Sequence, residues 1–150
     1  MKRILFSVMA LIACSTDSSA QVKASEAAMV QQTVDGTKIT IEYSRPAVRG
    51  RNPFGGVVHW GERWTPGANW ATTLEANKDI RIAGHPLAKG KYTIWLVPRQ
   101  SEDWTFVVDK RPQAYHTTRP DTTDAVLRFT VKPGQGAHVE RLTFSFPTVT

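Results

Sequence analysis

The sequence predicts an all-β protein, an antiparallel β-sandwich of about seven to nine strands. From about residue 28 onward, apolar residues recur at every second position within short runs, which is the period of a half-buried strand. Turn-forming glycine and proline separate these runs. No run after the N-terminal segment keeps a helical period. Short alternating strands divided by turns are typical of a two-layered sheet fold.

The clearest local signal is a hairpin near the start of this pattern. Asp35-Gly36 lies between the β-favouring runs "MVQQTV" and "TKITIEY", and Asp-Gly in that position is a strong hairpin signal. In the second run three apolar side chains share one face, those of Ile39, Ile41 and Tyr43. The alternation predicts a half-buried strand.

The later strands follow from the same pattern. Both faces are apolar from Ile94 to Val97, which indicates a central strand, and Pro98 ends it because proline cannot donate to a ladder. His85-Pro86 and "AKGK" predict turns. We predict these strands at residues 71–76, 78–84, 91–97, 103–109, 125–133 and 138–146.

The first twenty residues have the pattern of a bacterial signal peptide. Lys2 and Arg3 precede an apolar stretch at 4–13 that is too short to span a bilayer as a helix. "LIAC" then resembles a lipobox, with cleavage before Cys14 and a lipid attached to it, whereas "SSAQ" suits ordinary cleavage after Ala20. We favour an exported, membrane-anchored lipoprotein, with a periplasmic or secreted soluble form as the alternative.

These signals divide the chain into a signal peptide (1–20), a short tether (21–27) and a single β-sandwich domain (28–150). Cys14 is the only cysteine, so no disulfide forms within the chain. The full chain has a net charge of +6, and loss of Lys2 and Arg3 leaves 17 basic and 13 acidic residues, or +4. This mild basicity and an exported location argue against a nucleic-acid partner.

Residues 44–70 interrupt the strand pattern and carry the candidate binding residues. This stretch is rich in proline and glycine and ends in "HWGERWTPGANW", and long loops in compact domains are usually functional. Aromatic rings beside guanidinium groups suit sugars and anionic ligands. We expect Trp64 and Trp70 to close one end of the sandwich and Trp60 to be exposed. The candidate ligand-binding residues are Arg45, Arg51, Trp60, Arg63, Trp64 and Asn69.

Motifs for catalysis or metal binding are lacking in the sequence. The four histidines are widely spaced, unlike the paired ligands of common zinc sites, so we expect no metal and no cofactor. There is no G-x-S-x-G nucleophile elbow and no P-loop. The enzyme alternative would use Glu62 or Ser44, from the loop at 44–70.

Four stretches of the chain resemble a known bacterial family. "YSRPAVRGR", "FGG", "ERWTPGANWATT" and "LAKGKYTIWLVP" occur in that order and are similar to the family catalogued as domain of unknown function 2911. The resemblance covers roughly residues 28–146 and implies an exported, mostly β domain with no established activity and no catalytic residues to transfer. It also implies a further β-rich stretch beyond Thr150, so we expect either an absent C-terminal hairpin or a truncated sequence.

The function expected from these observations is binding. We predict a non-enzymatic module of the cell envelope whose loop at 44–70 binds an envelope glycan, an anionic ligand or another envelope protein, with membrane contact through the lipid anchor only. The alternative is an exported hydrolase that acts on envelope glycans or esters.

Overall fold

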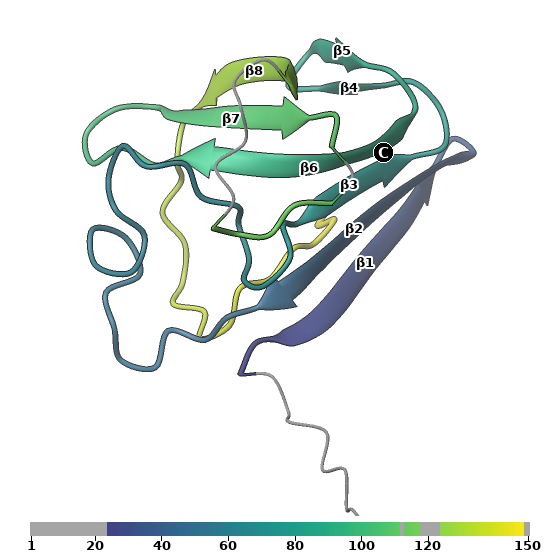
Figure 1. Cartoon of the computed structure of the whole chain (residues 1–150). Coiled ribbons are helices and arrows are strands. Elements are labelled where there is room, and N and C mark those ends of the chain that lie inside the picture. The colour runs from purple at the N-terminus through teal and green to yellow at the C-terminus, as the bar shows by residue number, and fades with distance from the viewer. Residues whose placement is uncertain (1–23, 112, 118–123, 149–150) are drawn as a thin grey trace, which may run out of the picture.

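A computed structural model describes residues 24–111, 113–117 and 124–148, and Figure 1 shows its strands. All paired strands are antiparallel, and no α-helix occurs in the described ranges, which confirms the predicted all-β class. The predicted signal peptide, with Cys14, lies outside the described residues. The eight strands are β1 (Glu26–Val34), β2 (Thr37–Arg45), β3 (Thr73–Ala76), β4 (Ile80–Ile82), β5 (His85–Leu87), β6 (Gly90–Val97), β7 (Trp104–Asp109) and β8 (Ala125–Val131).

Six strands form the main sheet in the order β1-β2-β3-β6-β7-β8, and β4 and β5 form a separate hairpin. The predicted turn between β1 and β2 is confirmed, because Asp35 and Gly36 both have positive φ, 48° and 68°, as a tight hairpin turn requires. The turn predicted at His85-Pro86 is wrong. It lies at Ala83-Gly84, where φ is 49° and 82°, and both residues of the dipeptide belong to β5.

One face of the main sheet carries the larger hydrophobic core. Leu74, Ile94 and Val108 from three strands pack there with Leu87 of β5. The β4–β5 hairpin, at the upper right in Figure 1, and the C-terminal segment, which passes behind the sheet, pack against this core and form the second, smaller layer of the sandwich. Phe144 of that segment contacts Tyr43 of β2 edge-on, with 4.8 Å between ring centroids.

The opposite face is covered by two irregular segments, here called the covering segments, one before β3 that holds Ala71 and one after β7 that holds Ala114. Trp95 and Val107 are buried there with Ala71 and Ala114, and the stretch that holds Ala114 crosses in front of the sheet in Figure 1. Backbone hydrogen bonds join the covering segments to each other, with Ala71 N–H donating to the Ala114 carbonyl over 2.7 Å. The two segments therefore sit as one cover over the sheet.

The last strand predicted from the sequence, at residues 138–146, is wrong. The described part of this segment contains no strand and forms one isolated bridge, between Arg141 and Ala47. Its partner is the irregular stretch after β2 and not β8, and residues 132–137, between β8 and this segment, form no strand. This pairing creates the site described next.

Candidate functional site

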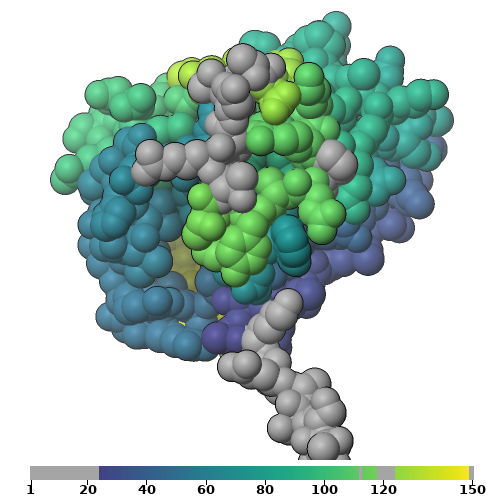
Figure 2. Space-filling view, viewed as in Figure 1, coloured from purple at the N-terminus to yellow at the C-terminus, as the bar shows by residue number. Residues whose placement is uncertain are grey.

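The loop after β2 and the C-terminal segment enclose a cavity of about 620 Å³, here called the loop cavity. Its walls come from residues 46–68 and 139–143, with Ser25 and His116 at its edge. In Figure 2 the molecule is hollowed between the blue loop and the green segment, and the yellow C-terminal segment is visible at the bottom of the hollow. The apolar lining residues are Pro46, Ala47, Val48, Pro53, Phe54, Val57, Val58, Trp64, Ala68, Val139 and Leu142.

Hydrogen bonds hold the two walls together. Val48 N–H donates to the Glu140 carbonyl over 2.9 Å, and Leu142 N–H donates to the Pro46 carbonyl over 3.1 Å. Arg45 Nε donates to the Leu142 carbonyl over 3.0 Å. Because buried backbone groups need partners, these bonds fix the C-terminal segment against the loop.

An aromatic cluster supports the loop wall. Phe54 stacks on Trp60 with ring centroids 6.1 Å apart and meets Trp64 and Trp104 edge-on at 5.8 Å and 4.8 Å. Trp64 also forms a two-way backbone bridge with Leu96 of β6. Rings in such arrangements add stability beyond their buried area, so a loop without regular strands keeps a fixed shape.

Two arginine side chains supply the positive charge of the loop cavity. Arg51, Arg141 and His116 line it, and no carboxylate side chain is among its described lining residues. Arg51 donates from Nε to the Val48 carbonyl and from Nη2 to the Ala47 carbonyl. The guanidinium of Arg141 has no hydrogen-bond or ion-pair partner among the described residues. The cavity can therefore offer positive charge to an anion.

The six predicted ligand-binding residues take different places. Arg51 and Trp64 line the loop cavity. Arg45 holds the C-terminal wall in position through its hydrogen bond to the Leu142 carbonyl. The backbone carbonyl of Asn69 holds His116, because it accepts from the backbone N–H of His116 at 2.8 Å and from the ring Nδ1 at 2.9 Å. Trp60 stacks behind Phe54, outside the described lining.

Arg63 lies away from the loop cavity, beside a buried acid in β7. Burial lowers the pKa of its guanidinium below the ordinary value, and the nearby charge of Arg128 lowers it further. The charges of Asp109 and Arg111 also act on it, which places Arg63 among the charged side chains on the front of the sheet.

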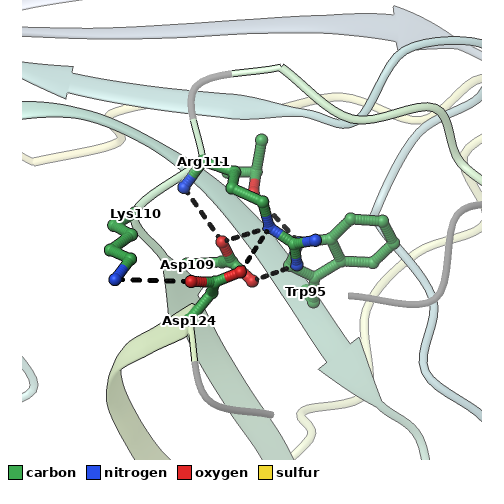
Figure 3. A network of polar contacts seen from close by, with 6 residues as sticks. Trp95, Asp109, Lys110, Arg111 and Asp124 are labelled. Carbon is green, nitrogen blue, oxygen red and sulfur yellow. Dashed lines mark hydrogen bonds and ion pairs between the residues drawn. The ribbon is translucent and has the colours of Figure 1, made fainter. Parts of the chain in front are cut away.

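Asp109 is the centre of that charged group and has no exposed surface. Arg111 donates to it from its backbone N–H at 2.9 Å, from Nε at 3.0 Å and from Nη2 at 2.7 Å. Asp124 pairs with both Arg111 and Lys110 at 3.3 Å, and Figure 3 shows these side chains beside Trp95. Burial would raise the pKa of the Asp109 carboxyl, but the bonds from Arg111 outweigh it and lower that pKa.

The sequence did not point to Arg141 or His116 as site residues. Arg141 belongs to a run that alternates like a strand, and its place in the cavity depends on a bridge to Ala47, far back in the chain. His116 stands in a polar connection without a motif. His116 lies close to turn residues and Arg141 lies within the predicted last strand, and neither position marks a binding site.

The exposure of the loop tryptophans agrees with the prediction for Trp60 and differs from it for Trp70. Trp60 is exposed at 38%, as predicted, but Trp70 is exposed at 51%, although we expected it to close the sandwich. Trp70 packs edge-on against Tyr115, 5.5 Å between ring centroids, and this contact covers only part of its ring. Trp64 is half-buried in the cavity wall.

The described residues contain no group of three or more histidine, cysteine, aspartate or glutamate side chains placed to hold a metal ion. Within the same part of the chain, no helix is long and apolar enough to cross a membrane.

Comparisons with known proteins place the chain in one family. Neither the search of curated proteins nor the search of solved structures found a match. One family model matches residues 25–150, which include both walls of the loop cavity. The chain therefore belongs to DUF2911, a family described as a protein of unknown function.

Proposed function

We propose that the protein is a binding module whose loop cavity takes an amphipathic anion, a molecule with an apolar body and a phosphate, sulfate or carboxylate group. The observation that carries this proposal is the combination of apolar walls with Arg51 and Arg141 and no described carboxylate in the lining. Ligand sites of this volume are commonly apolar with a few polar groups that orient the ligand.

The guanidinium groups support an anionic head group. Arginine carries five N–H donors in a planar fork that matches phosphate and carboxylate oxygens. Two nitrogens of Arg51 are bonded to backbone carbonyls, which fixes its position and leaves further donors, and Arg141 offers its whole guanidinium. An anion bound between them would gain charge-assisted hydrogen bonds.

The walls support an apolar body. Val57 and Val139 line the loop cavity and are exposed at 53% and 58%. Covering exposed apolar area contributes about 25 cal/mol per Å², so a chain or ring laid along these valines would stabilise the complex. The apolar body and the head group would then contact different parts of the same cavity.

The cell envelope is the setting we propose. The basic start, the apolar stretch at 4–13 and Cys14 support export as a lipoprotein. Amphipathic anions occur in envelopes as lipids and their breakdown products, and the same ligand chemistry would serve for either source.

The hydrolase alternative gains no support from the two side chains that it needs. Ser44 accepts a hydrogen bond from Asn69 Nδ2 at 3.2 Å and lines a different cavity, whereas Glu62 is exposed and lines neither cavity. Binding is therefore the function we propose.

Isothermal titration of octyl phosphate against the protein tests the proposal. We expect saturable binding at one site, with much weaker binding of octanol and of inorganic phosphate. Arg141→Gln should weaken the affinity about tenfold, equivalent to about 1.4 kcal/mol. Arg81→Gln is the matched control, because Arg81 is exposed on the β4–β5 hairpin and its one side-chain hydrogen bond within the described residues goes to the nearby Gly84 carbonyl. Equal affinity for octanol, or an equal loss in both variants, would contradict the proposal.

A further inference from the structure

A second cavity lies on the front face of the sheet, apart from the loop cavity. It has a volume of about 430 Å³, and β2, β3 and β6 form its floor while the covering segments form its rim. We call it the sheet cavity. Its polar lining residues are Glu42, Ser44, Thr73, Lys91 and Gln113, and Trp70 lies at its rim.

The charges of the sheet cavity compensate each other. Lys91 Nζ forms an ion pair with Glu42 and lies 3.9 Å from Glu75 Oε2. The hydrogen bond from Lys91 lowers the pKa of the Glu42 carboxyl below its ordinary value, so the Glu42 carboxylate stays charged at neutral pH beside its lysine partner. Unlike the loop cavity, this site offers no excess of positive charge from its described lining.

Several polar groups at this site have no partner among the described residues. They are the amide of Gln113 and the indole N–H of Trp70, together with one oxygen of Glu42, whose other oxygen accepts from Lys91 and from Thr73. The Ser44 hydroxyl accepts a bond from Asn69 and keeps its own proton to donate. The cavity thus presents both donors and acceptors beside an exposed aromatic ring.

We propose that the sheet cavity binds a neutral saccharide, with Trp70 stacking on a sugar ring and Glu42 and Gln113 bonding its hydroxyl groups. A sugar ring has an apolar face of C–H groups and a rim of hydroxyls that both donate and accept. An exposed indole face suits the first, and amide, carboxylate and hydroxyl groups suit the second. Compensated charge favours a neutral ligand over an anion. This inference does not rest on the function proposed for the loop cavity.

A panel of neutral oligosaccharides, namely cellotetraose, xylotetraose and tetra-N-acetylchitotetraose, tests the inference by calorimetry on the domain. We expect at least one of them to bind with one-to-one stoichiometry and with a change in tryptophan fluorescence. Trp70→Ala should weaken that binding about tenfold, which is the upper range for an aromatic contact. Gln113→Ala should weaken it as well, and both variants should melt near the wild-type temperature because these side chains are exposed.

Trp60→Ala is the matched control, because Trp60 is also exposed but lines neither cavity. It should leave saccharide affinity unchanged, and Trp70→Ala should leave octyl phosphate affinity unchanged. Absence of binding by all three saccharides at millimolar concentration overturns the inference. So does saccharide binding that resists Trp70→Ala or that Trp60→Ala weakens equally. None of these results bears on ligand binding in the loop cavity, which the octyl phosphate titration tests separately.

Discussion

Arg45 and Leu142 lie 97 residues apart in the sequence and are joined by a hydrogen bond. Arg45 closes β2, and its Nε donates to the Leu142 carbonyl over 3.0 Å while Nη2 donates to the Thr143 hydroxyl over 2.9 Å. The Thr143 hydroxyl in turn donates to the Arg141 carbonyl. One side chain therefore fixes the segment that carries Arg141 into the loop cavity.

Arg45→Gln should release this segment. We expect a loss of about 2 kcal/mol in the free energy of unfolding, the usual worth of hydrogen bonds from a charged group. Hydrogen exchange should quicken at the amides of Val48 and Leu142, which bond across the two walls, and not at Ile94 in the core. Arg81→Gln should change stability by less than about 0.5 kcal/mol. Unchanged exchange at Val48 and Leu142 would show that the walls hold without Arg45.

Asp109→Asn should destabilise the fold and flatten its pH dependence. Breaking a buried ion pair typically costs about 3 kcal/mol, and Asp109 is fully buried against Arg111. Its pKa is lower in the folded state than the ordinary value of about 3.9. The stabilisation is therefore complete above that ordinary value and is lost as pH falls through the folded pKa.

Chemical denaturation between about pH 6 and pH 2 measures both effects. The wild type should lose stability below about pH 4 more steeply than Asp109→Asn does. Asp103→Asn is the control, since Asp103 is exposed and forms no ion pair with any described residue. Parallel pH curves for the wild type and Asp109→Asn would show that this carboxylate is not the linked group.

Gly55 and Gly61 allow a paired test of the aromatic cluster. Both have positive φ, 82° and 79°, so alanine at either position should cost about 1–2 kcal/mol in backbone strain. A Cβ at Gly55 would also come within 2.6 Å of Trp60 Nε1, whereas a Cβ at Gly61 would have no neighbour within 4 Å. Only Gly55→Ala should displace Trp60 from Phe54 and shift the tryptophan emission. Identical emission in the two variants would rule out that packing.

Local signals were enough to predict much of the sheet. The Asp35-Gly36 turn and the doubly apolar run in β6 depend on neighbouring residues, and the structure confirms both the hairpin and the central position of β6. The turn at His85-Pro86 was misplaced because proline suggested a bend. In a two-stranded edge hairpin proline is tolerated, and Pro86 pairs with Arg81 there.

The loop cavity was harder to predict because its walls meet through distant pairing. The sequence singled out the stretch at 44–70 but contained no sign that Ala47 pairs with Arg141. The exposure of Trp70 was hard to predict for the same reason. A bulky apolar residue just before a strand suggests burial, but the path of the covering segments leaves its side chain exposed. Alternation predicts which face a side chain takes and not what covers that face.

Chemical-shift mapping of octyl phosphate on the labelled domain measures ligand contact with the loop cavity most directly. We predict that the largest amide shifts fall on both walls together, at Val57, Ala68 and residues 141–143, with the β4–β5 hairpin and the sheet cavity unmoved. Shifts confined to one wall, or spread over the exposed lysines without saturation, would contradict a ligand site between the loop and the C-terminal segment.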